Sequence, residues 1–285
     1  MYKQLNFSLP PMESVRLMSA GSRTEGRELR KYLARVNTSA GLDLPPWFFG
    51  YGENGEVDPT LKPAIAMSRI DDGVFQIAGI GPLASVLLAD KAEGLLNHLK
   101  GVVRGEVRMQ LSSGEHVLAS HGRRHYLVPQ LVLGRTTRYN NWWRRITEVE
   151  EAGGWSEASL AYLGWFMAQG IKSQFEDLIA QGDTVHGDLA EWLVDLMQSQ
   201  PDKVAVLNAL EARLGLQVEG VRAHSGVRST GPQGKRVMLK GILFSMNAEM
   251  TGPWIVGRNR IEGFGQIRPW VVSKQARIAE LMEMA

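Results

Sequence analysis

The chain has 285 residues, of which 44% are hydrophobic and 22% are charged, a composition typical of a globular protein and not of a disordered one. It contains no cysteine, which excludes disulfides and cysteine-containing zinc sites and fits a cytoplasmic location. The N-terminal residues lack the pattern of a signal peptide, and no apolar stretch approaches the roughly 18 residues that span a bilayer, so we expect no contact with a membrane.

The first part of the chain alternates between strand and helix patterns. The proline- and glycine-rich residues 41–63 predict a long loop. The predicted elements around this loop are a strand at 2–10, a helix at 21–36, a strand at 74–81, a helix at 82–99 and a hairpin at 106–120. Pro82 suits the first turn of its helix, and Ser113 and Gly114 suit the turn of the hairpin. This succession indicates the βαββαβ order of a ferredoxin-like domain.

A second set of strands follows and is interrupted by helices. Its strand patterns lie at 125–135, 215–226, 235–247, 254–257 and 264–272. Three segments between the first two of these carry apolar residues at helical spacing, at 159–171, 188–199 and 203–216. We find no internal sequence repeat, so the second set of strands is predicted from pattern alone.

The formal net charge of +2 hides a strong segregation of charge. Residues 148–219 contain 3 Lys+Arg and 13 Asp+Glu, whereas residues 220–285 contain 10 Lys+Arg and 4 Asp+Glu. The segment before residue 148 is also basic. The helical block is therefore acidic, and both flanking parts of the chain are basic.

Two intervals of the basic parts contain no acidic residue at all. The interval from Glu115 to Glu148 carries six arginines interleaved with tyrosines and tryptophans, namely Arg123, Arg124, Arg135, Arg138, Arg144 and Arg145. The interval from Glu219 to Glu249 carries Arg222, Arg228, Lys235, Arg236 and Lys240. A partner with many phosphates is the simplest reason to keep acids away from both intervals. The alternative is that they are ordinary solvated faces.

The helix predicted at 21–36 has an arginine face. Arg23, Arg27 and Arg30 fall within one narrow sector at helical spacing, while apolar side chains lie opposite. The planar guanidinium group suits phosphate oxygens. The alternative is a solvated face whose arginines pair with Glu25 and Glu28.

Glycines are concentrated just before the last predicted strand. The sequence GRNRIEGFG places Gly257, Gly263 and Gly265 around three polar residues, Arg258, Asn259 and Arg260. Glycine lets the backbone approach a ligand closely and adopt positive φ, and successive N–H groups can then bind phosphates. The alternative is a glycine-rich hairpin before an ordinary strand.

On these residues the chain resembles the RAMP superfamily of CRISPR-associated proteins, and within it the type IV branch of the endoribonuclease that cuts precursor CRISPR RNA. The motif at 257–265 is similar to the C-terminal glycine-rich loop of that family, and residues 71–99 are similar to its strand-to-helix segment. The resemblance covers most of residues 1–125 and 218–272 and leaves out the acidic helical block. It implies RNA binding by the glycine-rich loop, through Gly257, Arg258, Asn259, Arg260, Gly263 and Gly265. The predicted RNA-binding set also includes ten residues of the two basic intervals, namely Arg123, Arg124, Arg135, Arg138, Arg144, Arg145, Arg222, Arg228, Lys235 and Arg236.

The resemblance also implies a chemistry. Relatives cut without a metal: the 2′-hydroxyl attacks the neighbouring phosphate and leaves a 2′,3′-cyclic phosphate and a 5′-hydroxyl. Many relatives have a general-base histidine near the first helix, but residues 1–97 of this chain contain no histidine. Arginine stays protonated and is a poor base, so Arg23, Arg27 and Arg30 are predicted to stabilise the transition state. His121, His125 and His224 are alternative candidates for proton transfer.

The sequence therefore predicts an α+β protein with two ferredoxin-like (RRM-like) domains and a helical insertion. The N-terminal domain is predicted at 1–120 and the C-terminal domain at 121–285, with the acidic insertion at 148–217. The expected function is metal-independent cleavage of CRISPR repeat RNA, with retention of the repeat hairpin. The alternatives are a non-catalytic RAMP subunit that holds guide RNA and a DNA-binding regulator.

Cofactors and further partners complete the prediction. We expect no cofactor and no metal, because the sequences EH at 115–116 and HGD at 186–188 are isolated and lack ligand spacing. The acidic block is a poor RNA surface, so we expect it to point away from the RNA or to contact other CRISPR effector subunits.

Overall fold

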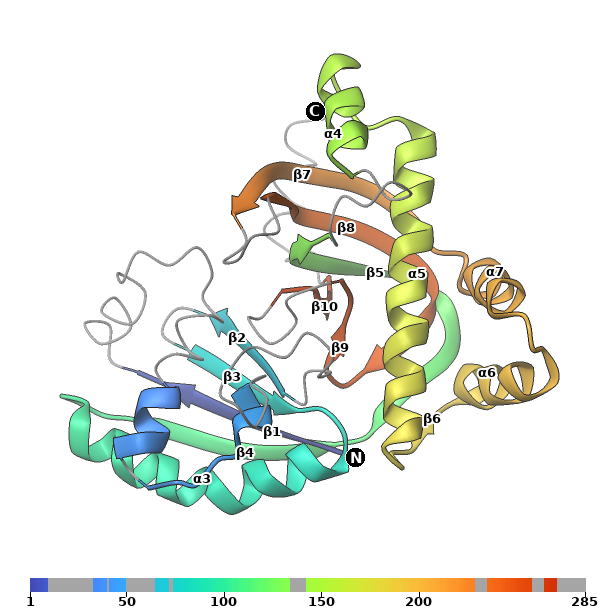
Figure 1. Cartoon of the computed structure of the whole chain (residues 1–285). Coiled ribbons are helices and arrows are strands. Elements are labelled where there is room, and N and C mark those ends of the chain that lie inside the picture. The colour runs from blue at the N-terminus through green and yellow to red at the C-terminus, as the bar shows by residue number, and fades with distance from the viewer. Residues whose placement is uncertain are drawn as a thin grey trace, which may run out of the picture.

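The computed structural model describes residues 1–9, 33–39, 41–49, 65–71, 74–133, 142–228, 235–257 and 264–270. Within these residues the chain forms two β-sheets, each with helices packed against it (Figure 1). None of the helices described there is long and apolar enough to cross a membrane.

The first sheet has the ferredoxin-like strand order. Its strands are β1 (Tyr2–Ser8), β2 (Ile65–Asp71), β3 (Val74–Gly79) and β4 (Arg108–Gly114), in the order β2-β3-β1-β4. The strand pairs β1–β3, β1–β4 and β2–β3 are all antiparallel. Residues 33–39 are helical between β1 and β2, and helix α3 (Pro82–Val102) connects β3 to β4. A short 3-10 helix, η1 (Pro46–Phe49), lies in the predicted long loop.

Alternation along β1 explains how this sheet packs. Leu5 and Phe7 are buried in one apolar cluster with Phe75 of β3 and Leu95 of α3, because successive side chains of a strand point to opposite faces. The rings of Phe7 and Phe75 stack at 5.6 Å. α3 and the helical residues 33–39 therefore cover one face of the first sheet (Figure 1).

The second sheet repeats the same strand order on a larger scale. It contains β5 (His116–Val132), β7 (Gln217–Arg228), β8 (Lys235–Thr251), β9 (Trp254–Ile255) and β10 (Gln266–Pro269), ordered β7-β8-β5-β10-β9. A two-residue strand, β6 (Val185–His186), pairs with the start of β5 in parallel. Taking β5, β7, β8 and β10 as strands one to four gives the order 2-3-1-4, as in the first sheet.

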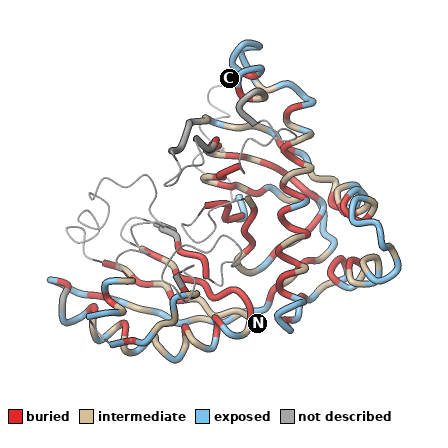
Figure 2. Tube along the Cα trace, viewed as in Figure 1, coloured by how far each residue is buried: buried red, intermediate tan, exposed pale blue. Residues whose placement is uncertain are grey.

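The acidic helical block lies between β5 and β7, where a ferredoxin-like domain has its first helix. It consists of α4 (Trp142–Glu151), α5 (Glu157–Ala180), α6 (Asp188–Ser199) and α7 (Lys203–Leu214). α5 takes the place of the first helix and is the most buried of the four (Figure 2). A Cβ at Gly170 would lie 2.7 Å from Val256 Cγ1, so α5 packs closely on the sheet there. α6 and α7 are additions beside it (Figure 1).

The residues HGD at 186–188 anchor α6 to β5. A Cβ at Gly187 would lie 2.5 Å from the carbonyl oxygen of Leu118, and the carboxylate of Asp188 accepts a 2.6 Å hydrogen bond from the Ser120 N–H. His186 lies 3.7 Å from Glu115. In the part of the chain that the structure describes, no group of three or more His, Asp or Glu side chains could hold a metal ion.

The predicted α+β fold of two ferredoxin-like domains with a helical insertion is confirmed. One local prediction is wrong: residues 106–120 do not form a hairpin. β4 pairs with β1, and β5 pairs with β6, β8 and β10, so the chain leaves one sheet and enters the other at Glu115. A turn-like Ser-Gly pair between two strands cannot distinguish a hairpin from such a crossing. The domain boundaries at 120 and 121 stay a prediction.

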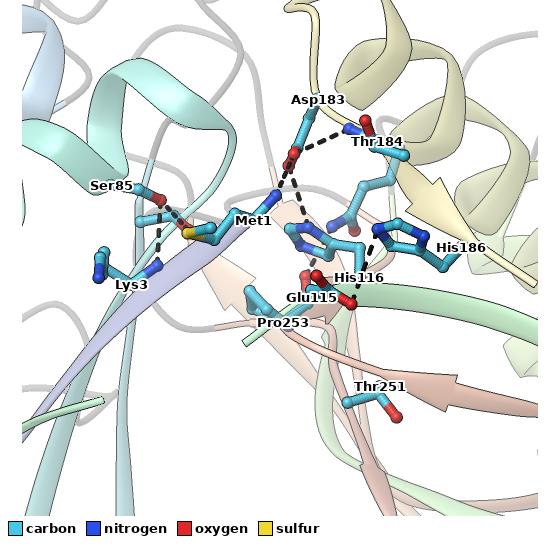
Figure 3. Close-up of polar contacts among 12 residues, drawn as sticks. Met1, Lys3, Ser85, Glu115, His116, Asp183, Thr184, His186, Thr251 and Pro253 are labelled. Carbon is cyan, nitrogen blue, oxygen red and sulfur yellow. Dashed lines mark hydrogen bonds and ion pairs between the residues drawn. The ribbon is translucent and has the colours of Figure 1, made fainter. Parts of the chain in front are cut away.

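A buried polar cluster lies where the first sheet meets the second (Figure 3). His116 is fully buried, and its Nδ1 lies 3.1 Å from the carboxylate of Asp183, which also contacts the amino group of Met1. The ring of Tyr2, on β1, lies 5.2 Å from the His116 ring, and Trp254 meets it edge-on at 6.2 Å. The Nε2 atom of His116 is buried and has no hydrogen-bond partner among the described residues.

This cluster predicts a pH-dependent stability. Burial lowers the pKa of His116 to about 4 from its ordinary value of 6.5, and the Asp183 carboxylate opposes the shift only in part. Because the unfolded chain takes up a proton on this residue first, the folded state loses stability as pH falls from 6.5 to 4, by about 3 kcal/mol in total. Urea unfolding of the native chain and of His116→Asn across this range measures that loss. Equal pH slopes for the two chains would contradict it.

Candidate nucleic-acid interface

The two described ends of the glycine-rich segment are fixed to the second sheet. The N–H of Gly265 donates to the Gln130 carbonyl at 2.7 Å, and the N–H of Val256 donates to the Gly265 carbonyl at 2.9 Å. Phe264 is buried in a small apolar cluster with Val132 and Met238. The chain before residue 258 and the chain after residue 263 are thus held next to each other on β5.

Gly257 and Gly265 are required by packing within the protein. Both have positive φ, +78° and +79°, which other L residues adopt at a cost. A Cβ on Gly265 would lie 1.7 Å from the Val256 carbonyl oxygen, and one on Gly257 would lie 2.4 Å from Leu131 Cδ1. These two glycines therefore let the chain approach its own strands. Their predicted contact with RNA stays a prediction.

Several basic segments begin or end at this same end of the second sheet. The N–H of Leu133 donates to the Val237 carbonyl at 3.0 Å, so the chain that leads to Arg135 departs beside β8. Arg228 pairs with Lys235 where β7 and β8 end. Gly257, which precedes Arg258, packs on Leu131. Basic stretches that are distant in sequence are therefore connected to one end of one sheet.

Arg123 and Arg124 lie on β5 and have partners within the protein. Arg123 donates to the Ser245 hydroxyl at 3.0 Å and also to Gln217. Arg124 donates to the carboxylate of Glu249 at 3.2 Å and lies 2.9 Å from Nε2 of His121. The pairing of β5 with β8 shifts between residues 120 and 124. Arg123 thus bonds only uncharged groups here, whereas Arg124 already faces a carboxylate.

Two histidines pair with carboxylates across the sheet and the helices. His125 Nε2 lies 3.1 Å from Glu219 Oε1, and about half of the His125 side chain is exposed. His224 Nε2 lies 2.7 Å from Glu150 Oε1, which ties β7 to α4. Each of the three histidines considered for proton transfer thus lies near an acidic side chain, since His121 is 4.0 Å from Glu249.

Arg145 and Arg222 occupy different environments. The guanidinium carbon of Arg145 lies 3.8 Å from the ring centre of Tyr162, a cation–π contact between α4 and α5. Arg222 is exposed, and its stem passes over Gly241 of β8. Arg222 is therefore available to a ligand, and Arg145 holds two helices together.

The remaining predicted site residues fall partly or wholly outside the description. The structure places the backbones, but not the side chains, of Arg144 in α4, Arg228 in β7, and Lys235 and Arg236 in β8. Outside the described residues lie Arg23, Arg27, Arg30, Arg135, Arg138, Arg258, Asn259, Arg260 and Gly263. The roles predicted for all of these stay predictions.

Sequence reasoning missed a row of side chains that crosses the second sheet. Gln217 pairs with Ser245, Ser245 pairs with His125, and the Trp270 N–H donates to the His125 carbonyl at 2.9 Å. The order of these strands and their register bring the four residues together. No motif in the sequence signals that register.

The described part of the chain thus consists of two ferredoxin-like units joined to an added helical block. The model of the type IV CRISPR-associated endonuclease Csf5 family matches residues 15–271 of this chain. The match covers most of the chain, so the chain belongs to that family. The recognition of a CRISPR-associated, Cas6-like endoribonuclease of type IV is thereby confirmed.

Solved structures are similar over nearly the whole chain. One described as "Csf5, CRISPR-Cas type IV Cas6 crRNA endonuclease" has 15% identity, covers 95% of this chain and 99% of its own, and gives a TM-score of 0.47. A crystal structure of Cas6b has 15% identity, 94% and 99% coverage, and a TM-score of 0.49. A comparison with curated proteins found no match.

The packing of the glycine-rich segment predicts a large effect of Gly265→Ala on stability. The new methyl group would add positive-φ strain and a collision with backbone, so we expect a loss of about 3 kcal/mol or more in the free energy of unfolding. Gly182→Ala is the matched control, because Gly182 has a similar φ of +75° and open space around its Cβ position. That control should lose only about 1 kcal/mol. If urea unfolding shows equal losses of stability for Gly265→Ala and Gly182→Ala, the packing role of Gly265 is contradicted.

Proposed function

We propose that this chain cuts CRISPR repeat RNA without a metal ion, leaves a 2′,3′-cyclic phosphate and a 5′-hydroxyl, and retains the repeat hairpin. Membership of an endonuclease family supports the reaction class. The observation that carries the proposal is the convergence of basic segments on one end of the second sheet, where Leu133, the β7–β8 ends and Gly257 meet. Clustered cations suit an RNA backbone because they neutralise its phosphates.

The proposed reaction depends on alignment of the 2′-oxygen with the phosphorus and the leaving 5′-oxygen, and it does not require a metal ion. The 2′-oxygen attacks the adjacent phosphorus in line, its proton passes to an acceptor, and the bond from phosphorus to the 5′-oxygen breaks. The leaving 5′-oxygen takes up a proton and becomes the 5′-hydroxyl. Negative charge increases on the non-bridging oxygens in the transition state, so fixed cations there accelerate the step.

Arg23, Arg27 and Arg30 are the groups that we propose for this stabilisation. Their shared helix face and planar donors suit the oxygens of a pentavalent phosphate. One such contact is worth on the order of a hundredfold in rate. His121, His125 and His224 remain the candidates for proton transfer; the first two lie on β5, and about half of each side chain is exposed.

The acidic helices fit a different partner. Among the residues whose side chains the structure describes, Glu191, Asp195 and Asp202 are exposed on or beside α6 and α7. Like charges repel an RNA backbone, so we propose that α6 and α7 face away from the RNA and contact another effector subunit that has a basic surface. This assignment is independent of the cutting reaction.

The reaction predicts cleavage in excess EDTA with a defined product end. Purified protein incubated with its repeat RNA should cut once per repeat, and the upstream product should carry a cyclic phosphate that mass spectrometry identifies. The same sample should keep the hairpin product bound through size-exclusion chromatography. A 5′-phosphate product, or cutting that stops in EDTA, would contradict the proposal.

Arginine variants in the same assay separate chemistry from binding. Arg23→Ala, Arg27→Ala and Arg30→Ala should each slow single-turnover cutting by about a hundredfold and weaken RNA binding much less. Lysine should restore little, because an ammonium group does not reproduce the guanidinium fork. Arg222→Ala is the control: it removes one exposed charge from β7, so it should alter binding and its salt dependence and leave the rate of the bound complex unchanged.

A further inference from the structure

We propose that Trp270, together with His125, forms a stacking platform for an RNA base on the face of the second sheet that α5 does not cover. This inference rests on the proposed function for its ligand class, single-stranded RNA next to the hairpin. Among the Trp, Tyr and Phe residues whose side chains the structure describes, Trp270 is the only exposed one, with 42% of its surface accessible. An exposed tryptophan next to polar side chains is an unusual feature of a sheet that otherwise buries its large aromatic side chains.

The strand register places Trp270 beside His125. Arg268 of β10 is opposite Leu127 and Pro269 is opposite Tyr126, so Trp270 is opposite His125 and its N–H donates to the His125 carbonyl at 2.9 Å. Side chains of directly opposite residues lie on the same face with Cβ atoms about 5 Å apart. The register therefore places the Trp270 and His125 side chains on the same face of the sheet, from adjacent positions joined by a backbone hydrogen bond.

The row continues across the sheet with polar side chains. His125 is opposite Ser245 on β8, and Ser245 is opposite Gln217 on β7. Arg123 lies over Ser245 and bonds both Ser245 and Gln217. From one edge to the other the exposed groups are thus the Trp270 indole, the His125 imidazole, the Arg123 guanidinium and the Gln217 amide, while the Ser245 hydroxyl is buried beneath Arg123.

This face is the one turned away from α5. Val218 and Phe244, each next in sequence to a member of the row, are buried in the apolar core that also contains α5 residues. A Cβ added at Gly164 of α5 would lie 3.9 Å from Val218 Cγ2. Because neighbouring residues in a strand point to opposite faces, Gln217 and Ser245 point away from the helix.

The charges around the row favour a base over a phosphate. Glu219 lies 3.1 Å from His125, and Glu249 lies 3.2 Å from Arg124, so carboxylates already face two of the nearby basic groups. A phosphate at this position would meet those carboxylates, whereas an uncharged base would not. Stacking of bases on aromatic side chains is tolerant of sequence and independent of charge. The row is thus a complement to the basic end of the sheet, which suits the phosphates.

Fluorescence of a stacked base tests the platform directly. A short single-stranded RNA that carries 2-aminopurine should lose fluorescence on binding the native chain. Trp270→Ala should bind this probe, and the repeat RNA, about tenfold more weakly, and the quenching should disappear. Trp270→Phe should restore binding to within about threefold, because a phenyl ring still stacks. The salt dependence of binding should be the same in all three, since no charge is changed.

Leu111→Ala is the matched control, since Leu111 is also 42% exposed but lies on β4 of the other domain. It should bind both RNAs like the native chain. Native affinity and native quenching in a folded Trp270→Ala would overturn the platform, even if the native chain cuts repeat RNA. Conversely, quenching that depends on Trp270 in a chain that does not cut would uphold the platform and overturn the proposed function. A native chain that binds neither RNA would overturn both.

Discussion

The antiparallel pairing of β5 with β8 is the interaction on which the rest of the structure depends. The two strands are paired from Val117 and Thr251 to Val132 and Met238, and three features of the described structure lie along this ladder. The glycine-rich segment packs on one end, through Val132 and Met238. The Trp270 row crosses the middle at His125. The buried cluster of His116 lies at the other end, where the first sheet begins.

This ladder also explains how one chain can hold both a basic and an acidic region. The long connection from β5 to β7 carries the acidic helices, and α5 uses its buried side chains to cover one face of the second sheet. Several basic segments begin or end at the strand ends instead. Because helices and strand ends lie in different places on the sheet, segregation of charge along the sequence becomes segregation in space. The proposed RNA ligand and the proposed basic protein partner then need not compete for one surface.

Periodicity allowed much of the fold to be predicted from the sequence. The helices at 82–99, 188–199 and 203–216 appear close to their predicted bounds, because their apolar residues repeat at helical spacing. The strand β2 at Ile65–Asp71 was not singled out, since it follows a long proline- and glycine-rich stretch. The hairpin at 106–120 was wrong because local turn residues do not record which strand is the partner.

The candidate site was harder to predict for the same physical reason. Charge and composition identify the basic stretches, and the glycine pattern identifies Gly257 and Gly265 as candidate RNA contacts. Their packing against Leu131 and the Val256 carbonyl depends on contacts that sequence spacing does not show. The Trp270 row likewise needs the register of four strands. Long-range pairing is thus the information that the sequence patterns lacked.

Photo-crosslinking of bound repeat RNA to the native chain tests the central claim most directly: that RNA lies on the second sheet, at its basic end and on the face that α5 leaves uncovered. Mass spectrometry of the cross-linked peptides should find β5, the ends of β7 and β8, and residues 257–270, with none from α6 or α7. Cross-links concentrated in α6 and α7, with none on β5 or at 257–270, would contradict the account.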